Sequence, residues 1–156
     1  AVGAHLHLAS RDQALARAGE VARQVGLQAQ LDKLAGDLTV AGRKRLELAR
    51  ALATRPRLLL LDEVLAGLNP QEIADMIPVV QDLVRSGVTV LMIEHVMQAV
   101  MSLASQVWVL AQGQLIAQGS PLEVTANPAV VEAYLGHGTA ARLRERSTAA
   151  RAGEGA

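Results

Sequence analysis

Two dipeptides with ionisable side chains follow short apolar runs in this sequence, and this placement suggests chemistry. Asp62-Glu63 comes directly after the run Leu58 to Leu61, and Glu94-His95 comes directly after residues 88–93. Short continuous apolar runs are typical of strands buried on both faces of a parallel sheet. Open α/β sheets bind their ligands at the carboxyl ends of such strands. Asp62, Glu63 and His95 are therefore candidate site residues.

The chemistry that fits these residue types is metal-assisted reaction of a phosphate. Asp62 can hold Mg²⁺ directly or through water, and Glu63 can orient or deprotonate an attacking water. His95 can reach the same site and hydrogen-bond a terminal phosphate or that water. Alternatives stay open, because apolar runs also precede acidic pairs at ordinary strand ends, and a single histidine is often a solvated or capping residue.

The segment 58–93 is predicted to form the β-α-β unit that positions these residues. Its two apolar runs supply the strands. Between them, Asn69 and Glu72 have the spacing of a capping box with Pro70 at the first helical position, and Ser86-Gly87 ends the helix. Such a crossover makes the strands parallel and adjacent. We therefore expect the two strand ends to converge on one pocket.

Flanking elements are predicted from caps and hydrophobic periodicity. One helix begins at Ser10 and ends near Gly26, and another runs from about Gly42 to Thr54. Further along we expect a helix over residues 96–104, a hairpin that turns at residues 112–113, and a short helix that begins at residues 127–128. The tail over residues 139–156 has no wide apolar face, so we expect it to be disordered.

The composition excludes several classes of protein. The chain has 156 residues and is 51% hydrophobic, which suits one domain with a core of small aliphatic side chains. Its 15 basic and 15 acidic residues cancel, so we expect no nucleic-acid partner. The absence of cysteine excludes disulfides and thiolate metal sites. No apolar run approaches the roughly 18 residues of a membrane span.

The beginning of the sequence has neither an initiator methionine nor a signal-peptide pattern. We therefore expect the chain to be the interior of something longer. A phosphate-binding loop would need Gly-x-x-x-x-Gly-Lys followed by Ser or Thr. The nearest stretch, Gly36 to Lys44, has its glycines one residue too far apart and Arg43 in place of lysine. The sequence contains no such loop.

Basic residues occupy the start of the helix predicted near Gly42. The run Arg43 to Arg45 has the wrong sign for the positive end of a helix dipole. An anion bound at that helix start would explain it, because backbone N–H groups and basic side chains would then bind phosphate together. A solvated basic turn that pairs with Glu47 is the alternative.

Taken in order, several segments resemble the motifs of ABC ATPases. Residues 38–52 resemble the signature motif and its helix, Leu58 to Glu63 resembles Walker B, residues 66–69 resemble the D-loop, and His95 resembles the switch histidine. A closer similarity to the ATPase subunits of bacterial branched-chain amino acid importers is carried by residues 66–70, 93–95, 107–110 and 127–136. The resemblance covers roughly residues 38–136.

This resemblance implies an α/β fold of the P-loop NTPase class, present in part. Its core would be a parallel β-α-β unit, with a segment of the helical subdomain and a C-terminal β-hairpin. It divides the chain into residues 1–41, part of the helical subdomain ending in the signature motif; 42–120, the C-terminal portion of the ATPase core; 121–138, a C-terminal extension of the branched-chain amino acid transporter type; and 139–156, the tail.

The resemblance also implies ATP hydrolysis coupled to amino acid import, with ATP and Mg²⁺ as cofactors. Asp62 would take part in Mg²⁺ binding, Glu63 would polarise the hydrolytic water, and His95 would contact the γ-phosphate. The implied partners are a second ABC ATPase subunit, in a homo- or heterodimer, and transmembrane permease subunits. The implied location is peripheral, on the cytoplasmic face of the plasma membrane.

Four further residues are implied in nucleotide contact. Thr39 stands where the signature motif usually has Ser and could donate its hydroxyl across the dimer. Ala41-Gly42 replaces the usual Gly-Gln pair, so the backbone approach to phosphate must tolerate a methyl group. Asn69 would face the partner, although its capping role explains it equally well. Since the phosphate loop is missing, we expect a truncated chain that is inactive alone; the alternative is a non-catalytic module that docks on a permease or an intact ATPase.

Overall fold

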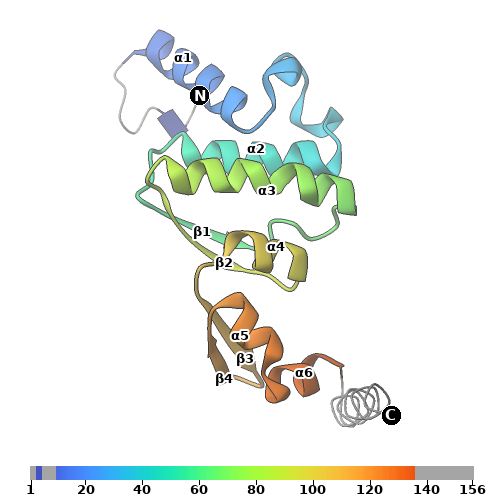
Figure 1. Ribbon diagram of the computed structural model, residues 1–156. Helices are drawn as coiled ribbons and strands as arrows, with labels where there is room; N and C mark the ends of the chain where they lie inside the picture. Colours follow the sequence, from blue (N-terminus) through green and yellow to red (C-terminus); the bar gives the residue numbers. More distant parts are fainter. Residues whose placement is uncertain (1–2, 5–9, 136–156) are drawn as a thin grey trace, which may run out of the picture. The chain divides into compact units, whose positions relative to one another are not determined.

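The computed structural model describes residues 3–4 and 10–135 (Figure 1). The chain forms two compact units, residues 1–99 and 100–156. The division expected from the resemblance, at residues 41/42 and 120/121, follows motifs rather than compactness and stays a prediction. The tail expected to be disordered, residues 139–156, lies outside the described residues. No described helix is both long enough and apolar enough to cross a membrane.

The first unit contains three long helices and a two-stranded sheet. In chain order these are α1 (Arg11–Gln24), two short 3₁₀ turns (Gln28–Gln30 and Ala35–Asp37), α2 (Val40–Leu52), β1 (Leu58–Asp62), α3 (Pro70–Arg85) and β2 (Thr89–Ile93), followed by α4 (Met97–Leu103) at the boundary. The second helix begins two residues before the predicted Gly42, because the hydroxyl of Thr39 caps it by accepting the Gly42 N–H at 3.1 Å.

The predicted β-α-β unit is confirmed. β1 and β2 are parallel and adjacent, with Leu58 opposite Thr89 and Asp62 opposite Ile93. The crossover helix α3 begins with the expected capping box, in which Asn69 Oδ1 accepts the Glu72 N–H at 3.0 Å and Glu72 Oε2 accepts the Asn69 N–H at 2.9 Å. Two orphan donors at the helix start are thereby satisfied, which fixes where α3 begins.

The core of the first unit lies between the sheet and two helices. Figure 1 shows α2 and α3 side by side over one face of β1 and β2, with α1 packed on α2. Leu59 and Leu61 of β1 point into this layer and are 4% and 8% exposed. The helices of this layer also bury side chains, among them Leu48 of α2 and Met76 and Val80 of α3. Aliphatic side chains thus fill the core, as the composition predicts.

No described element of the first unit covers the other face of this sheet, which corrects the prediction that the strands are buried on both faces. Burial alternates along β1, and the outward side chains Leu58, Leu60, Leu91 and Ile93 are 52–66% exposed. We call these four residues the exposed apolar face. The prediction failed because apolar composition reports what a strand can bury, whereas actual burial depends on whether a second layer is present.

The second unit is built on an antiparallel hairpin with two short helices. β3 (Val107–Ala111) pairs with β4 (Gln114–Gly119). The predicted turn is confirmed, since Gln112 and Gly113 both have positive φ, 50° and 77°, as a tight hairpin turn requires. Then follow α5 (Pro121–Ala126), which sequence reasoning missed, and α6 (Pro128–Leu135). Val109, Val124 and Val130 form the core of this unit.

Candidate functional site

The two strand ends that carry the candidate residues lie at the same edge of the β1–β2 sheet. Asp62, the last residue of β1, is opposite Ile93, the last residue of β2. The Glu63 N–H donates to the carbonyl oxygen of Ile93 at 3.0 Å, so the backbone ladder continues one residue past β1. This register places Glu63 beside the segment that carries Glu94 and His95.

Glu63 and His95 are the two candidate residues whose side chains the structure brings together. Oε1 of Glu63 lies 3.4 Å from Nδ1 of His95, and the two side chains are 55% and 60% exposed. At that distance and exposure the pair adds little stability. The pair does place a carboxylate and an imidazole next to each other in solvent, at the edge of the sheet where β1 and β2 end. Both groups can reach a molecule bound there.

The backbone at Glu63 is held in an uncommon conformation. Its φ of 46° is left-handed, which for a residue other than glycine costs about 1–3 kcal/mol and persists only where the surroundings impose it. Its carbonyl oxygen accepts the Ala66 N–H at 3.0 Å, and Nζ of Lys44 on α2 lies 3.5 Å from the same oxygen. Residues 63–66 therefore form a fixed turn, called here the Glu63 turn.

Asp62 is exposed and lines a small cavity of about 160 Å³ whose wall also includes Lys44 and Glu47. Among the described residues, no group of three or more His, Cys, Asp or Glu side chains could hold a metal ion. Mg²⁺ is commonly held by one or two carboxylates together with substrate phosphates. A single carboxylate at this strand end fits that mode of binding, and it does not fit an all-protein metal cage.

Thr39 and Gly42 lie at the start of α2, and the structure gives each of them a packing role. Thr39 caps the helix, and its exposed hydroxyl can still donate a hydrogen bond. A Cβ at Gly42 would lie 3.1 Å from Cβ of Leu38 and 3.3 Å from Oγ1 of Thr39. The glycine thus allows the close approach on which the cap depends. Ala41 is half-buried beside them, and Asn69 caps α3.

Comparison with known proteins now identifies the family. Residues 3–66 match the family model described as ABC transporter, and residues 114–140 match the model described as branched-chain amino acid ATP-binding cassette transporter. The chain is 43% identical over 129 residues to the high-affinity branched-chain amino acid transport ATP-binding protein BraF of Pseudomonas aeruginosa, and 38% identical over 128 residues to LivG of Salmonella typhimurium. This chain belongs to the ABC-transporter ATP-binding proteins. The resemblance found in the sequence is confirmed.

Solved structures confirm the fold of this ABC ATP-binding chain. The ADP conformation of MJ1267, an ATP-binding cassette, superposes with a TM-score of 0.75 at 31% identity, covering 83% of this chain and 52% of that one. CbiO1 of Clostridium perfringens, part of the ABC transporter complex cbiONQ, superposes with a TM-score of 0.73 at 26% identity, covering 92% and 58%. The chain spans about half the length of the curated relatives that it matches.

Two residues of this ABC chain make contacts that the sequence did not predict. Glu94 uses Oε1 to accept the Leu65 N–H at 3.0 Å, inside the Glu63 turn. Arg45 reaches the backbone of α1 and of α3. The signal for Glu94 was its place directly after β2. The sequence marked Arg45 only as part of a basic run that could bind an anion, and its contacts could not be predicted because both partners are remote along the chain.

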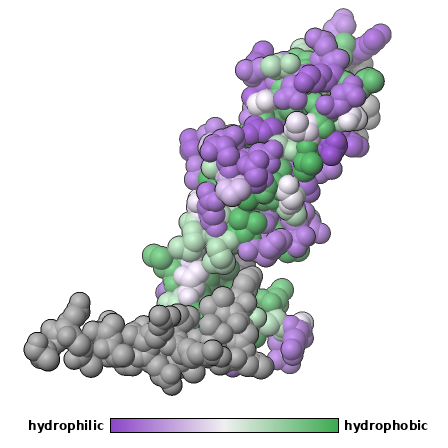
Figure 2. All heavy atoms as spheres, turned by 90° about the vertical axis from the view of Figure 1, so that its right-hand side faces the viewer, coloured by the Kyte–Doolittle hydropathy of each residue, from purple (hydrophilic) through white to green (hydrophobic). Residues whose placement is uncertain are grey.

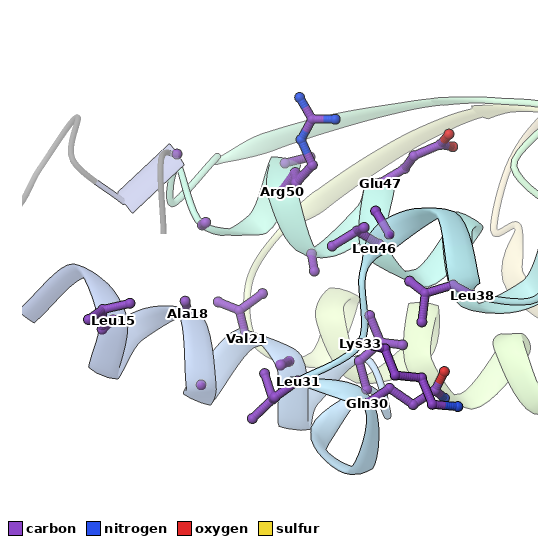
Figure 3. A pocket seen from close by; sticks show the side chains of 18 of the residues that line it. Leu15, Ala18, Val21, Gln30, Leu31, Lys33, Leu38, Leu46, Glu47 and Arg50 are labelled. Atoms are coloured by element: carbon purple, nitrogen blue, oxygen red, sulfur yellow. The ribbon is translucent and has the colours of Figure 1, made fainter.

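Another cavity of the ABC chain, a groove of about 1030 Å³, lies between α1 and α2 (Figure 3). Leu15, Val21 and Leu46 supply much of its apolar wall, and Lys33 and Arg50 lie around it (Figure 3). None of the ionisable candidate residues lines it. On the face in Figure 2, hydrophilic residues cover most of the helical part, with hydrophobic residues visible between them.

Proposed function

We propose that this chain forms the part of an ABC ATPase subunit that supplies the acid, the histidine and the signature-type helix for ATP hydrolysis coupled to import of branched-chain amino acids. The observation that carries the proposal is the approach of Glu63 to His95 at 3.4 Å, on the edge where β1 and β2 both end. The matches to BraF and LivG support the class of cargo.

In this proposal the chain's own residues orient water and phosphate. Glu63 accepts a hydrogen bond from the attacking water, and its fixed backbone turn presents the carboxylate without reorganisation at the moment of reaction. His95 donates to the terminal phosphate or to that water. Asp62 is the residue that would hold Mg²⁺, and the ion would supply neutralisation of phosphate charge.

A second contact with nucleotide is proposed at the start of α2. Thr39 presents an exposed hydroxyl there, and the N–H groups of Val40 and Ala41 have no partner within the helix. The N–H of Gly42 is already taken by the Thr39 cap, so Gly42 would contribute through its lack of a side chain. Basic side chains follow at residues 43–45. This end would meet the nucleotide held by a second ATPase subunit. Asn69, which is exposed at the start of α3, would lie at the same subunit interface.

In this proposal the phosphate loop comes from another stretch of polypeptide, since the chain has no Gly-x-x-x-x-Gly-Lys. The exposed apolar face fits the same view, because parallel strands in α/β proteins are normally covered on both faces. In the whole subunit, the part of the cassette that this chain does not span would cover that face. The subunit would bind permease subunits at the cytoplasmic face of the membrane.

A non-catalytic docking module is the second candidate, favoured by the missing phosphate loop. Calorimetric titration of the chain with Mg²⁺-ATP addresses it first. We expect no saturable binding in the micromolar range, because one carboxylate and one helix start do not replace the loop. Micromolar binding would contradict both the docking module and the proposed dependence on an external loop.

The catalytic proposal is tested by joining the chain to the part of BraF that it does not match, and measuring ATP turnover. Glu63→Gln removes the charge and keeps the shape, so turnover should fall about 10²- to 10⁴-fold, the usual contribution of a positioned base. Glu72→Gln is the matched control, since Glu72 caps α3 and should leave turnover unchanged. Equal turnover of the Glu63→Gln variant and the unmodified protein would remove Glu63 from its role.

A joined protein that never hydrolyses ATP, yet co-purifies with permease subunits, would favour the docking module.

A further inference from the structure

The Glu63 turn is held by two consecutive residues at the end of β2. On one side, the carbonyl oxygen of Ile93 accepts the Glu63 N–H at 3.0 Å. On the other side, Oε1 of Glu94 accepts the Leu65 N–H at 3.0 Å, across a separation of 29 residues in the sequence. The next residue of the same segment is His95. One short segment therefore fixes the turn that carries the carboxylate and also carries the imidazole that the carboxylate approaches.

The hydrogen bond between Glu94 and the Leu65 N–H restrains the Glu63 turn, whose backbone conformation is unfavourable by itself. Left-handed backbone at Glu63 is unfavourable, so the surroundings must impose it. Leu65 is anchored in the core at 1% exposure, which keeps its N–H away from water and makes a missing acceptor costly. A carboxylate that accepts a backbone N–H makes one of the stronger hydrogen bonds in proteins. Glu94 is thus placed to hold the turn from the side opposite Ile93.

We propose that Glu94 is a positioning residue, which holds the Glu63 turn so that the carboxylate of Glu63 stays beside His95. Among the described residues, Glu94 makes no hydrogen bond or ion pair with the side chain of Glu63 or of His95. It acts through the Leu65 N–H. The effect of Glu94 on ATP hydrolysis rests on the proposed function. The restraint of the Glu63 turn by Glu94 does not rest on it, and this restraint can be measured without nucleotide.

The second carboxylate oxygen of Glu94 suggests which substitution should preserve the role. Oε2 is buried and has no hydrogen-bond partner among the described residues. Glu94→Gln keeps the Oε1 acceptor and places an amide group where that unpaired oxygen was. Glu94→Ala removes the acceptor altogether. Comparison of the two variants therefore separates loss of the hydrogen bond from loss of charge.

The test is nuclear magnetic resonance of the full 156-residue chain, with amide hydrogen exchange as the first measurement. In the Glu94→Ala variant, the Leu65 N–H should exchange about 10- to 100-fold faster, because a hydrogen bond to a charged acceptor is lost. In the Glu94→Gln variant the acceleration should be less than about 10-fold, because a neutral acceptor keeps part of the hydrogen bond. Glu72→Ala is the matched control: it removes another carboxylate-to-backbone bond, at Asn69, and should leave Leu65 unchanged.

The second measurement is the resonances of the His95 ring. Glu63→Gln defines the shift that follows when the neighbouring carboxylate is replaced. Glu94→Ala should move the ring resonances in the same direction, since the carboxylate leaves, while Glu72→Ala should not. Unchanged Leu65 exchange or an unmoved His95 ring in Glu94→Ala would overturn the proposal. Acceleration of the α3 amides by the same factor as Leu65 would also overturn it, because it would mean a general packing role. Failure of ATP turnover in the joined protein would instead count against the proposed function.

Discussion

Arg45 of α2 donates a hydrogen bond from Nη1 to the carbonyl oxygen of Val25 at 2.8 Å, at the residue that ends α1. Its Nη2 lies 3.4 Å from the carbonyl oxygen of Asp75 on α3. One guanidinium therefore joins three helices. The backbone passes close to it at Gly26, where φ is 74° and a Cβ would lie 2.6 Å from Nη1. The left-handed Gly26, which follows the end of α1, thus makes room for Arg45.

Replacement of Arg45 by Met should loosen α1 from the other two helices. The substitution keeps an aliphatic stem and removes the donors, so the free energy of unfolding should fall by about 1–3 kcal/mol, the range for hydrogen bonds to charged groups. Urea denaturation followed by circular dichroism measures it. Arg85→Met is the matched control, since Arg85 is exposed and its ion pair among the described residues is with Asp82 on its own helix. This variant should cost less than about 0.5 kcal/mol. Equal costs for the two variants would contradict the role given to Arg45.

Thr39 has a capping role that can be separated from its proposed contact with nucleotide. Thr39→Ala removes the acceptor for the Gly42 N–H and should lower the free energy of unfolding by about 0.5–2 kcal/mol. Thr39→Ser keeps the hydroxyl and should restore most of that stability. Thermal unfolding of the three chains measures the difference. A Thr39→Ala variant as stable as the unmodified chain would mean that the cap contributes nothing, and would leave nucleotide contact as the only role proposed for this hydroxyl.

The parts of the fold that the sequence predicted are those specified by neighbouring residues. The β-α-β unit followed from apolar runs and from the cap at Asn69, whose partner Glu72 is three residues away. The hydrogen bond from Leu65 to Glu94 could not be predicted in this way, because it depends on how the strand ends meet in space. Helix α5 could have been predicted, because Ser120 and Glu123 have the same capping-box spacing as Asn69 and Glu72, but this signal was overlooked. The approach of Glu63 to His95 was expected from matched strand ends, whereas their catalytic roles stay predictions.

The exposed apolar face predicts how the chain behaves on its own. Contiguous exposed apolar side chains on a sheet promote association and bind apolar dyes. Leu60→Glu, at a position 66% exposed, should reduce binding of anilinonaphthalene sulfonate and shift sedimentation toward the monomer. Because the side chain is outside the core, the free energy of unfolding should change by less than about 0.5 kcal/mol.

Two controls make the measurement on this face specific. Leu59→Glu places a charge at a position only 4% exposed, and should unfold the first unit rather than make it more soluble. Leu122→Glu changes an exposed leucine of α5, at 71%, which is not part of the face. An equal loss of dye binding in the Leu122 and Leu60 variants would show that the face has no special role in association.

The cap of α5 should make the second unit sensitive to acid. Glu123 accepts the Ser120 N–H at 2.7 Å, and this bond, with the contact to the Ser120 hydroxyl, lowers the pKa of the Glu123 carboxyl below its ordinary value of 4.5. A carboxyl with a lower pKa in the folded state binds fewer protons there than in the unfolded state. Its contribution is therefore fully present above pH 4.5 and is lost as the pH falls through the folded-state pKa.

Glu123→Gln should remove this part of the acid sensitivity, because the amide keeps an acceptor and does not titrate. We expect the stability of the unmodified chain to exceed that of the variant above pH 4.5, and the difference to shrink below it. Chemical denaturation at a series of pH values measures the difference. Gly119 provides an independent check, because a Cβ there would lie 2.8 Å from Oε2 of Glu123 and Gly119→Ala should displace the carboxylate. A constant difference between the unmodified chain and Glu123→Gln across the acidic range would show that the cap does not depend on the charge, since the ionised form would then gain nothing from the Ser120 N–H.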